Sequence, residues 1–133
     1  MKKLLTLLLV VFTLCGNAFA DEILKMRATS FAIKSTDDYG YWSDWSDWED
    51  CSVLVVINVT NDRVNIYSST PQVYDIYDYG EEEYDDNGTT TTFNCIDDEG
   101  LQCDMRIRIQ NDGQVQLYID YSDIMWVYNV ELK

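Results

Sequence analysis

Histidine is absent from this chain of 133 residues. Its absence excludes the catalytic triads that use histidine as a base and the zinc sites that use it as a ligand. The sequence also has no glycine-rich phosphate loop and no Cys-x-x-Cys pair, so it predicts no nucleotide or dithiol site of those kinds. None of the 24 acidic residues is marked by its context as a buried catalytic group. We therefore expect no enzyme, since a small hydrolase would require a cleft with two buried carboxylates.

Basic residues are scarce. The whole chain has nine Lys and Arg residues against 24 Asp and Glu residues, a formal charge of −15. Lys2 and Lys3 lie in the first twenty residues, so residues 21–133 have seven basic residues against 24 acidic ones, a formal charge of −17. Such a surface repels nucleic acid and anionic lipid and fits a cationic partner or plain solubility better. Disorder is not expected, because the chain contains ten tyrosines and four tryptophans, whereas disordered acidic segments have few aromatic residues.

The first twenty residues have the pattern of a signal peptide. Lys2 and Lys3 precede an apolar run that is too short for an ordinary membrane span, and "AFA" supplies the small residues of a cleavage site. Cleavage before Asp21 leaves residues 21–133 as one β domain without a membrane span. The signal looks bacterial, so we expect an exported protein, periplasmic or secreted.

Apolar and polar residues alternate between turn signals along the rest of the chain. The predicted strands cover residues 22–34, 51–59, 64–68, 72–79, 89–96, 101–109, 114–121 and 125–132. The first is long enough to contain a bulge. About eight strands with short connections favour an antiparallel meander that closes into a lipocalin-like up-and-down barrel, because closure removes exposed edges. A two-layer β-sandwich is the alternative.

The acidic segment "EEEYDDNG", residues 81–88, is predicted to be a charged hairpin loop that ends in an Asn-Gly turn. Glu83, Asp85 and Asn87 copy the first half of an EF-hand loop, but Asn94 stands where the closing glutamate is needed. We therefore expect no structural metal and no cofactor.

The four cysteines divide between the signal and the domain. Lipidation of Cys15 is an alternative to cleavage, but Leu14 precedes it where a lipobox has a small residue. Cys51, Cys95 and Cys103 all fall on predicted inward faces. If "DEG" forms a three-residue turn, Cys95 lies opposite Cys103. Because exported proteins favour paired cysteines, the sequence predicts a Cys95–Cys103 disulfide, with Cys51 as a competing partner.

The stretch "YWSDWSDWEDC", residues 41–51, places a tryptophan at every third position. This spacing fits a polyproline-like segment, which aligns the tryptophans along one edge and the aspartates along another. In one interpretation the tryptophans pack, either by capping an open barrel end or by stacking on the outward-facing Arg106 and Arg108. In the other they form an exposed recognition surface. We expect at least one to pack against the barrel and at least one to stay partly exposed. The candidate binding residues are Tyr41, Trp42, Asp44, Trp45, Asp47 and Trp48.

Residues 42–52, "WSDWSDWEDCS", resemble the W-S-x-W-S-x-W-x-x-C-S opening of a thrombospondin type-1 repeat, and the first five also match the W-S-x-W-S box of class I cytokine receptors. The resemblance implies tryptophans stacked with arginine in a ladder. The other cysteines and the arginine-rich strand of that repeat are missing, so we interpret the match as local convergence. As a whole, the chain is similar to small uncharacterised secreted proteins of the Bacteroidetes, in its signal, its tryptophan run and its "QVYDI" and "MWVYN" strands.

Two functions fit these observations. The first is an exported, non-catalytic protein that binds a small apolar or glycan-like ligand through the tryptophan run and the barrel mouth beside it. The alternative is a protein–protein interaction or inhibitor module that docks on a basic partner. A large internal cavity would favour the first, and a filled core with exposed tryptophans would favour the second.

Overall fold

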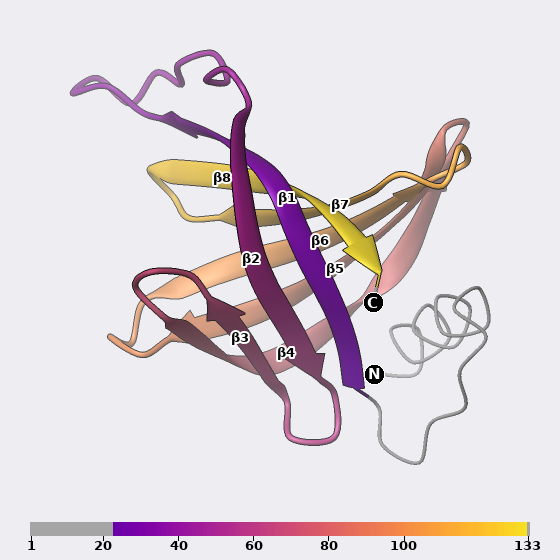
Figure 1. The fold of residues 1–133 in the computed structure, drawn as a ribbon. Coiled ribbons are helices and arrows are strands. Elements are labelled where there is room, and N and C mark those ends of the chain that lie inside the picture. Colours follow the sequence, from indigo (N-terminus) through magenta and orange to yellow (C-terminus); the bar gives the residue numbers. More distant parts are fainter. Residues whose placement is uncertain (1–22, 133) are drawn as a thin grey trace.

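The computed structural model describes residues 23–132, so the expected signal peptide, residues 1–20, and its cleavage site lie outside the described residues. The described chain forms a closed barrel of eight antiparallel strands in sequence order, in which β8 returns to pair with β1 (Figure 1). The strands are β1 (Ile23–Ser35), β2 (Glu49–Asn58), β3 (Arg63–Tyr67), β4 (Gln72–Asp85), β5 (Gly88–Asp97), β6 (Gln102–Gln110), β7 (Val115–Asp120) and β8 (Ile124–Leu132). The predicted lipocalin-like meander is confirmed, and the sandwich alternative is wrong. No helix long and apolar enough to cross a membrane occurs within residues 23–132.

The interior of the barrel is a packed core. Every strand contributes buried side chains to one hydrophobic cluster, as the period-two alternation predicts. The largest of them, including Met26, Ile57, Phe93, Met105 and Leu117, are fully buried. The inner space of this small barrel is therefore filled with side chains, as expected for eight strands without an enclosed ligand.

The expected bulge in β1 is confirmed: the register shifts between Ala28 and Ser30 against both neighbouring strands. The predicted loop at residues 81–88 is wrong. β4 continues through most of it, Glu83 lies opposite Thr90 of β5, and only two residues form the turn. The run of β-branched threonines in β5 gives the acidic strand a good pairing partner, and this cross-strand pairing outweighs the loop-like charge pattern.

The turn between β5 and β6 has the predicted form. Gly100 has a φ of +86°, and the Asp97 N–H donates to the Leu101 carbonyl over 2.9 Å. Cys95 lies opposite Cys103, so the predicted register is confirmed. The expected disulfide is not formed, because all three cysteines of the described chain are free thiols. Pair types alternate along a hairpin, so the 95/103 pair repeats the hydrogen-bonded type of the 97/101 pair. The Cβ atoms of such a pair lie about 5.5 Å apart, farther than the ~3.5–4.5 Å that a disulfide needs.

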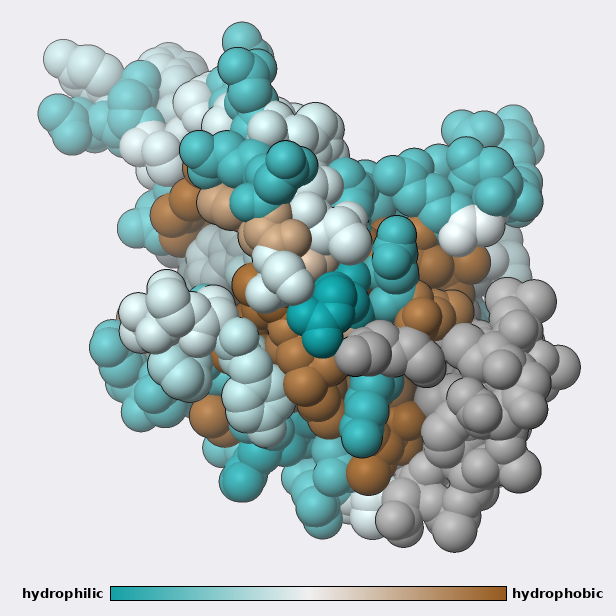
Figure 2. Space-filling view, viewed as in Figure 1, coloured by the Kyte–Doolittle hydropathy of each residue, from teal (hydrophilic) through white to brown (hydrophobic). Residues whose placement is uncertain are grey.

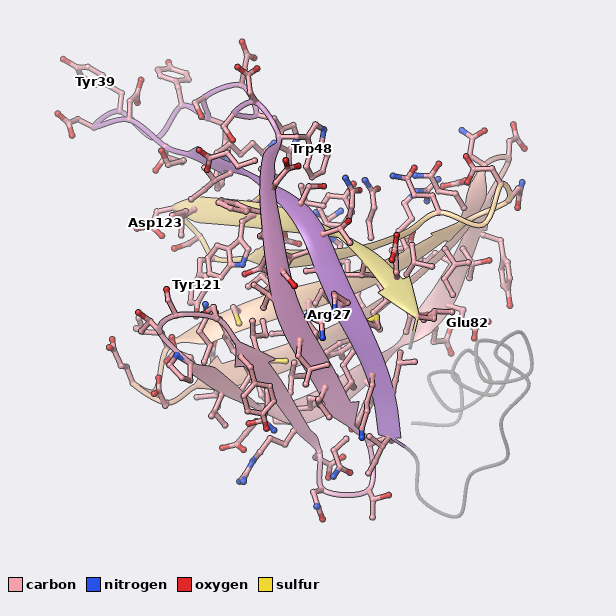
Figure 3. The ribbon with its side chains drawn as sticks, viewed as in Figure 1. Arg27, Tyr39, Trp48, Glu82, Tyr121 and Asp123 are labelled. Atoms are coloured by element: carbon pink, nitrogen blue, oxygen red, sulfur yellow. The ribbon has the colours of Figure 1, made fainter. Side chains whose placement is uncertain are left out.

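Four connections lie at one end of the barrel, which we call the mouth end. They are the long β1–β2 connection and the short β3–β4, β5–β6 and β7–β8 connections, all on the left in Figure 1. Figure 3 shows Tyr121 and Asp123 at this end, below the projecting segment that carries Tyr39, and Glu82 at the opposite end. The predicted binding residues therefore belong to the mouth end of the barrel and to the outer surface next to it.

Candidate functional site

The tryptophan run lies beside the second half of β1 and is hydrogen-bonded to it through its serines. The backbone N–H groups of Ser43 and Ser46 donate to the carbonyls of Ser35 and Ile33, each over 2.8 Å. In return, the N–H groups of Ser35 and Ile33 donate to the hydroxyl oxygens of Ser43 and Ser46, over 3.1 and 2.9 Å. Each serine thus forms two bonds with one residue of β1, and its hydroxyl replaces a backbone carbonyl.

This pairing matches three residues of the run to every two residues of β1. Opposite positions are Ser43 and Ser35, Ser46 and Ile33, then Glu49 and Phe31. Each repeat therefore advances about 6.7 Å, two strand residues, and not the ~9.3 Å of a polyproline turn. The polyproline interpretation is therefore wrong, because the run advances less per residue than that conformation does.

The three tryptophans share one side of the run, as predicted. Since alternate strand residues point the same way, a repeat locked to every second residue of β1 also points one way. The Lys34 ammonium lies 5.6 Å from the ring centre of Trp42 and 4.8 Å from that of Trp45. Trp45 and Trp48 line one groove. We call Trp42, Trp45 and Trp48 the tryptophan ridge.

The ridge continues onto the outer face of the barrel through Tyr118. The rings of Trp45 and Tyr118 meet edge to face, with centres 6.3 Å apart. The Arg106 guanidinium lies 4.2 Å above Tyr118 and is bonded twice to Asp120, over 2.5 and 3.0 Å. A row of rings and cations results, in which Lys34 lies between two tryptophans and Arg106 lies over Tyr118.

The expectation that Arg106 or Arg108 stacks on the tryptophans is therefore wrong. Asp120 binds the Arg106 guanidinium over Tyr118, and Arg108 is bonded to Asp85 and Thr90. Each arginine already has a carboxylate partner on a neighbouring strand or turn, which fixes its fork-shaped head away from the ridge.

The ridge is partly packed and partly open. Trp42 and Trp45 are 39% exposed and Trp48 is 49% exposed, so the expectation of at least one packed and at least one exposed tryptophan is confirmed. A groove of about 210 Å³ separates Trp45 from Trp48. Ala32 and Val127 line this groove, lie opposite each other on β1 and β8, and are almost fully buried. The ridge therefore covers a small apolar patch on the outside of the barrel.

The predicted aspartates of the run lie on the surface. The hydroxyls of Ser43 and Ser46 donate to the backbone carbonyls of Asp44 and Asp47, over 3.0 and 3.1 Å. Neither carboxylate has a hydrogen bond or an ion pair with any residue of the described chain. Tyr41 is exposed in the tip turn, where its N–H donates to Asp37. Figure 2 shows hydrophilic and pale residues mixed over this projecting segment, with little hydrophobic surface.

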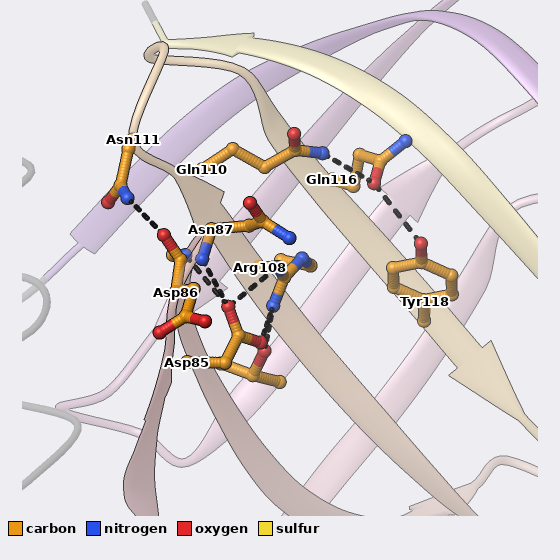
Figure 4. Close-up of polar contacts among 10 residues, drawn as sticks. Asp85, Asp86, Asn87, Arg108, Gln110, Asn111, Gln116 and Tyr118 are labelled. Carbon is orange, nitrogen blue, oxygen red and sulfur yellow. Dashed lines mark hydrogen bonds and ion pairs between the residues drawn. The ribbon is translucent and has the colours of Figure 1, made fainter.

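A chain of side-chain amides lies on the outer face next to the groove. The Tyr118 hydroxyl and the Gln110 amide both donate to the Gln116 oxygen, over 3.1 and 3.4 Å (Figure 4). The Gln116 amide donates to Asn129, and Asn129 donates to the hydroxyl of Ser30. These bonds fix the orientation of Tyr118 and leave an array of polar atoms beside an aromatic wall.

The acidic hairpin does not form a metal site. Asp85 accepts two bonds from Arg108, over 2.9 and 3.1 Å, and the backbone N–H groups of Asn87 and Gly88 also donate to it (Figure 4). The Arg108 and Asn87 bonds lower the pKa of Asp85 to about 2. Within residues 23–132, no three His, Cys, Asp or Glu side chains are close enough together to hold a metal ion.

Comparisons of this chain with protein-family models, curated proteins and solved structures found no match. Only the geometry of the described residues therefore indicates what the site binds. Sequence reasoning missed Lys34 and Tyr118, the two residues that connect the ridge to the barrel. A signal existed for Lys34 only: it lies near the end of the predicted first strand, and a run that folds back along that strand passes over it.

Proposed function

We propose that this protein is an exported, non-catalytic binding module that docks a basic partner protein on its tryptophan ridge. The observation that carries the proposal is the position of Lys34. Two indole rings already hold an ammonium group between them, while the carboxylates of Asp44 and Asp47 beside them have no partner in the described chain. Aromatic rings with adjacent carboxylates are well suited to cationic side chains.

Trp48 is the open position in this row. It is the most exposed of the three tryptophans, and no cation lies over its ring in the described chain. Asp47 precedes it and Glu49 follows it. An arginine from a partner can stack on the Trp48 ring and donate to these carboxylates, an arrangement worth roughly 0.5–2 kcal/mol per stacked cation. The formal charge of −17 attracts such a partner from a distance and speeds the encounter.

The filled interior supports this function over a ligand enclosed within the barrel. The expected discriminator was a large internal cavity, and the side chains of all eight strands pack in that space. Exposed tryptophans were the second feature expected of a protein–protein module, and the three ridge tryptophans are exposed.

Titration with two peptides of equal length tests the proposal. One peptide is arginine-rich and the other is neutral, and tryptophan fluorescence and calorimetry report binding. The variant Asp44→Asn/Asp47→Asn should weaken binding of the arginine-rich peptide by about five-fold, because each lost carboxylate contributes roughly 0.5 kcal/mol near the surface. The matched control is Glu81→Gln/Glu83→Gln, which removes two exposed charges from β4.

The comparison between the two double variants decides the outcome. If both weaken binding equally, only net charge attracts the peptide and the ridge is not a docking surface. If the neutral peptide binds as well as the arginine-rich one, the partner is not recognised by its positive charge.

A glycan-like ligand is the second candidate, and the groove beside the amide chain favours it. Trp45, Trp48 and Tyr118 offer ring faces to sugar C–H groups, while Gln116 and Asn129 lie beside them to bond hydroxyls. Glycan-array binding that is lost in Trp48→Ala and insensitive to salt would favour this candidate over a basic protein.

Export is part of the proposal. The sequence pattern of residues 1–20 supports it. N-terminal sequencing of the protein from a bacterial periplasm or culture medium should give a chain that starts at Asp21. A chain that starts at a lipid-modified Cys15 would instead identify a lipoprotein.

A further inference from the structure

A second concave site lies at the mouth end of the barrel, separate from the ridge. It has a volume of about 420 Å³, within the usual range for small-ligand pockets. One wall is aromatic: Tyr121 and Trp126 stack with ring centres 5.7 Å apart, and Tyr74 lies beside them. Leu101 and Ile124 add apolar surface. Leu101 follows directly after the tight turn and is 55% exposed.

The other wall of this pocket is acidic. Asp97, Asp98, Glu99 and Asp123 line it, and no lysine or arginine of the described chain does. Asp97 is held in place at the base of the turn: it accepts the Tyr121 hydroxyl over 2.8 Å and the N–H groups of Glu99 and Leu101, each over 2.9 Å. The side chains of the other three carboxylates make no bonds within the described chain, so they are available to a ligand.

The hydrogen bond between Asp97 and Tyr121 is accompanied by pKa shifts in opposite directions. Burial opposes ionisation of Asp97, but the bonds from Tyr121 and the turn amides outweigh it and lower the pKa of this carboxyl. Burial and then the neighbouring Asp97 raise the pKa of Tyr121. Asp97 is therefore negative and Tyr121 is a neutral donor, so the pocket offers negative charge beside ring faces.

These two walls select the charge of a ligand. An anion would meet four carboxylates without a compensating cation, and a neutral apolar molecule would leave them unused. We propose that the mouth pocket binds a small apolar amine, an aromatic or branched aliphatic ammonium compound, with its carbon skeleton against Tyr121 and Trp126 and its ammonium among Asp98, Glu99 and Asp123. Cation–π attraction and carboxylate contacts then act on the same group.

This site does not depend on the proposed docking of a basic protein. The two surfaces meet at Asp123, whose carbonyl accepts the N–H of Thr36 over 2.9 Å at the start of the β1–β2 connection. Figure 3 shows Asp123 between the projecting segment and Tyr121. A ligand in the pocket therefore lies next to the ridge. The pocket contains Trp126, whereas the ridge contains the other three tryptophans, so the signals of the two sites can be observed separately.

The test uses three probes with one ring: benzylammonium, benzyl alcohol and benzoate. Each is titrated into the folded protein while the four indole N–H signals are followed by NMR and assigned by single Trp→Phe variants. Benzylammonium should shift the Trp126 signal, benzyl alcohol should bind more weakly, and benzoate should not bind. The variant Asp98→Asn/Glu99→Gln should weaken benzylammonium binding about five-fold, since each exposed carboxylate–ammonium pair contributes roughly two- to three-fold.

Two control variants separate this pocket from the ridge. Glu81→Gln/Glu83→Gln removes the same charge from the far part of β4, and Asp44→Asn/Asp47→Asn removes it from the ridge; neither should change benzylammonium affinity by more than about two-fold. Shifts confined to the ridge tryptophans, equal affinity for benzyl alcohol, or no shift at Trp126 would each overturn the amine site. The arginine-rich peptide result is unaffected by any of these outcomes, so the two proposals fail separately.

Discussion

Replacing Trp45 by alanine should measure how much the ridge stabilises the barrel. The ring of Trp45 lies against Tyr118, covers the patch formed by Ala32 and Val127, and contacts the Lys34 ammonium. These contacts join the β1–β2 connection to strands β1, β7 and β8. The variant loses all of them at once without touching the barrel core.

The expected loss follows from the area that the ring covers. Trp45 is 39% exposed, so about 150 Å² of a side chain of roughly 250 Å² is covered. At ~25 cal/mol per Å² this corresponds to at most about 4 kcal/mol. Alanine keeps part of the contact, and the unfolded chain already covers some apolar area, so we expect a loss of about 2–3 kcal/mol. Trp48→Ala should lower the free energy of unfolding by less, because Trp48 is 49% exposed.

Urea denaturation followed by circular dichroism gives the free energy of unfolding without depending on tryptophan fluorescence. Tyr39→Ala is the matched control, because Tyr39 is 86% exposed in the same connection, and it should change stability by less than about 0.5 kcal/mol. A double-mutant cycle with Tyr118→Ala should show a coupling of ~0.5–1.5 kcal/mol with Trp45. If Trp45→Ala costs no more than Tyr39→Ala, the ridge does not pack on the barrel and the argument for its geometry fails.

Three further predictions follow from single contacts. Ser46→Ala should lower the free energy of unfolding by about 1 kcal/mol in urea denaturation, because a β1 amide loses its acceptor; an unchanged value would show that water replaces the hydroxyl. Since the pKa of Asp85 is lowered to about 2, its stabilising effect is complete above its ordinary pKa of ~3.9 and lost as pH falls toward 2. Asp85→Asn should therefore differ from the parent protein in urea denaturation at pH 5 and converge with it near pH 2, and a constant difference would contradict this. Burial raises the pKa of the Cys103 thiol to about 11 and also raises that of Cys95, so both should react with a disulfide reagent at pH 8 more slowly than the less buried Cys51; equal rates would contradict it.

The eight strands could be predicted because their signals are local. Alternation and turn residues located most strand ends to within one or two residues, and the Asp-Glu-Gly turn gave the register that places Cys95 opposite Cys103. The second half of β4 could not be predicted in this way. Its glutamates resemble a solvated loop, and only the threonines of β5 opposite them make it a strand.

The site was harder to predict because its contacts join distant parts of the chain. The tryptophans were identified, but their true partners, Lys34 and Tyr118, are brought to them by the fold-back along β1 and by barrel closure through β8. The mouth pocket had even less local signal. Its walls come from three connections and the strand ends beside them, and only the closed barrel places them together.

The repeat itself explains why Trp42 and Trp45 are each followed by serine and then aspartate. A run that matches three residues to two of β1 leaves β1 amides without a backbone acceptor, and the hydroxyls of Ser43 and Ser46 supply it. The aspartate is the extra residue of each repeat, and it lies on the surface with its carboxylate free of contacts in the described chain. Serine is thus required by the backbone and tryptophan by packing, whereas neither requirement applies to Asp44 or Asp47. Asp44 and Asp47 are therefore available to bind a partner without a role in the fold. For this reason their double substitution should change partner binding and leave stability unchanged.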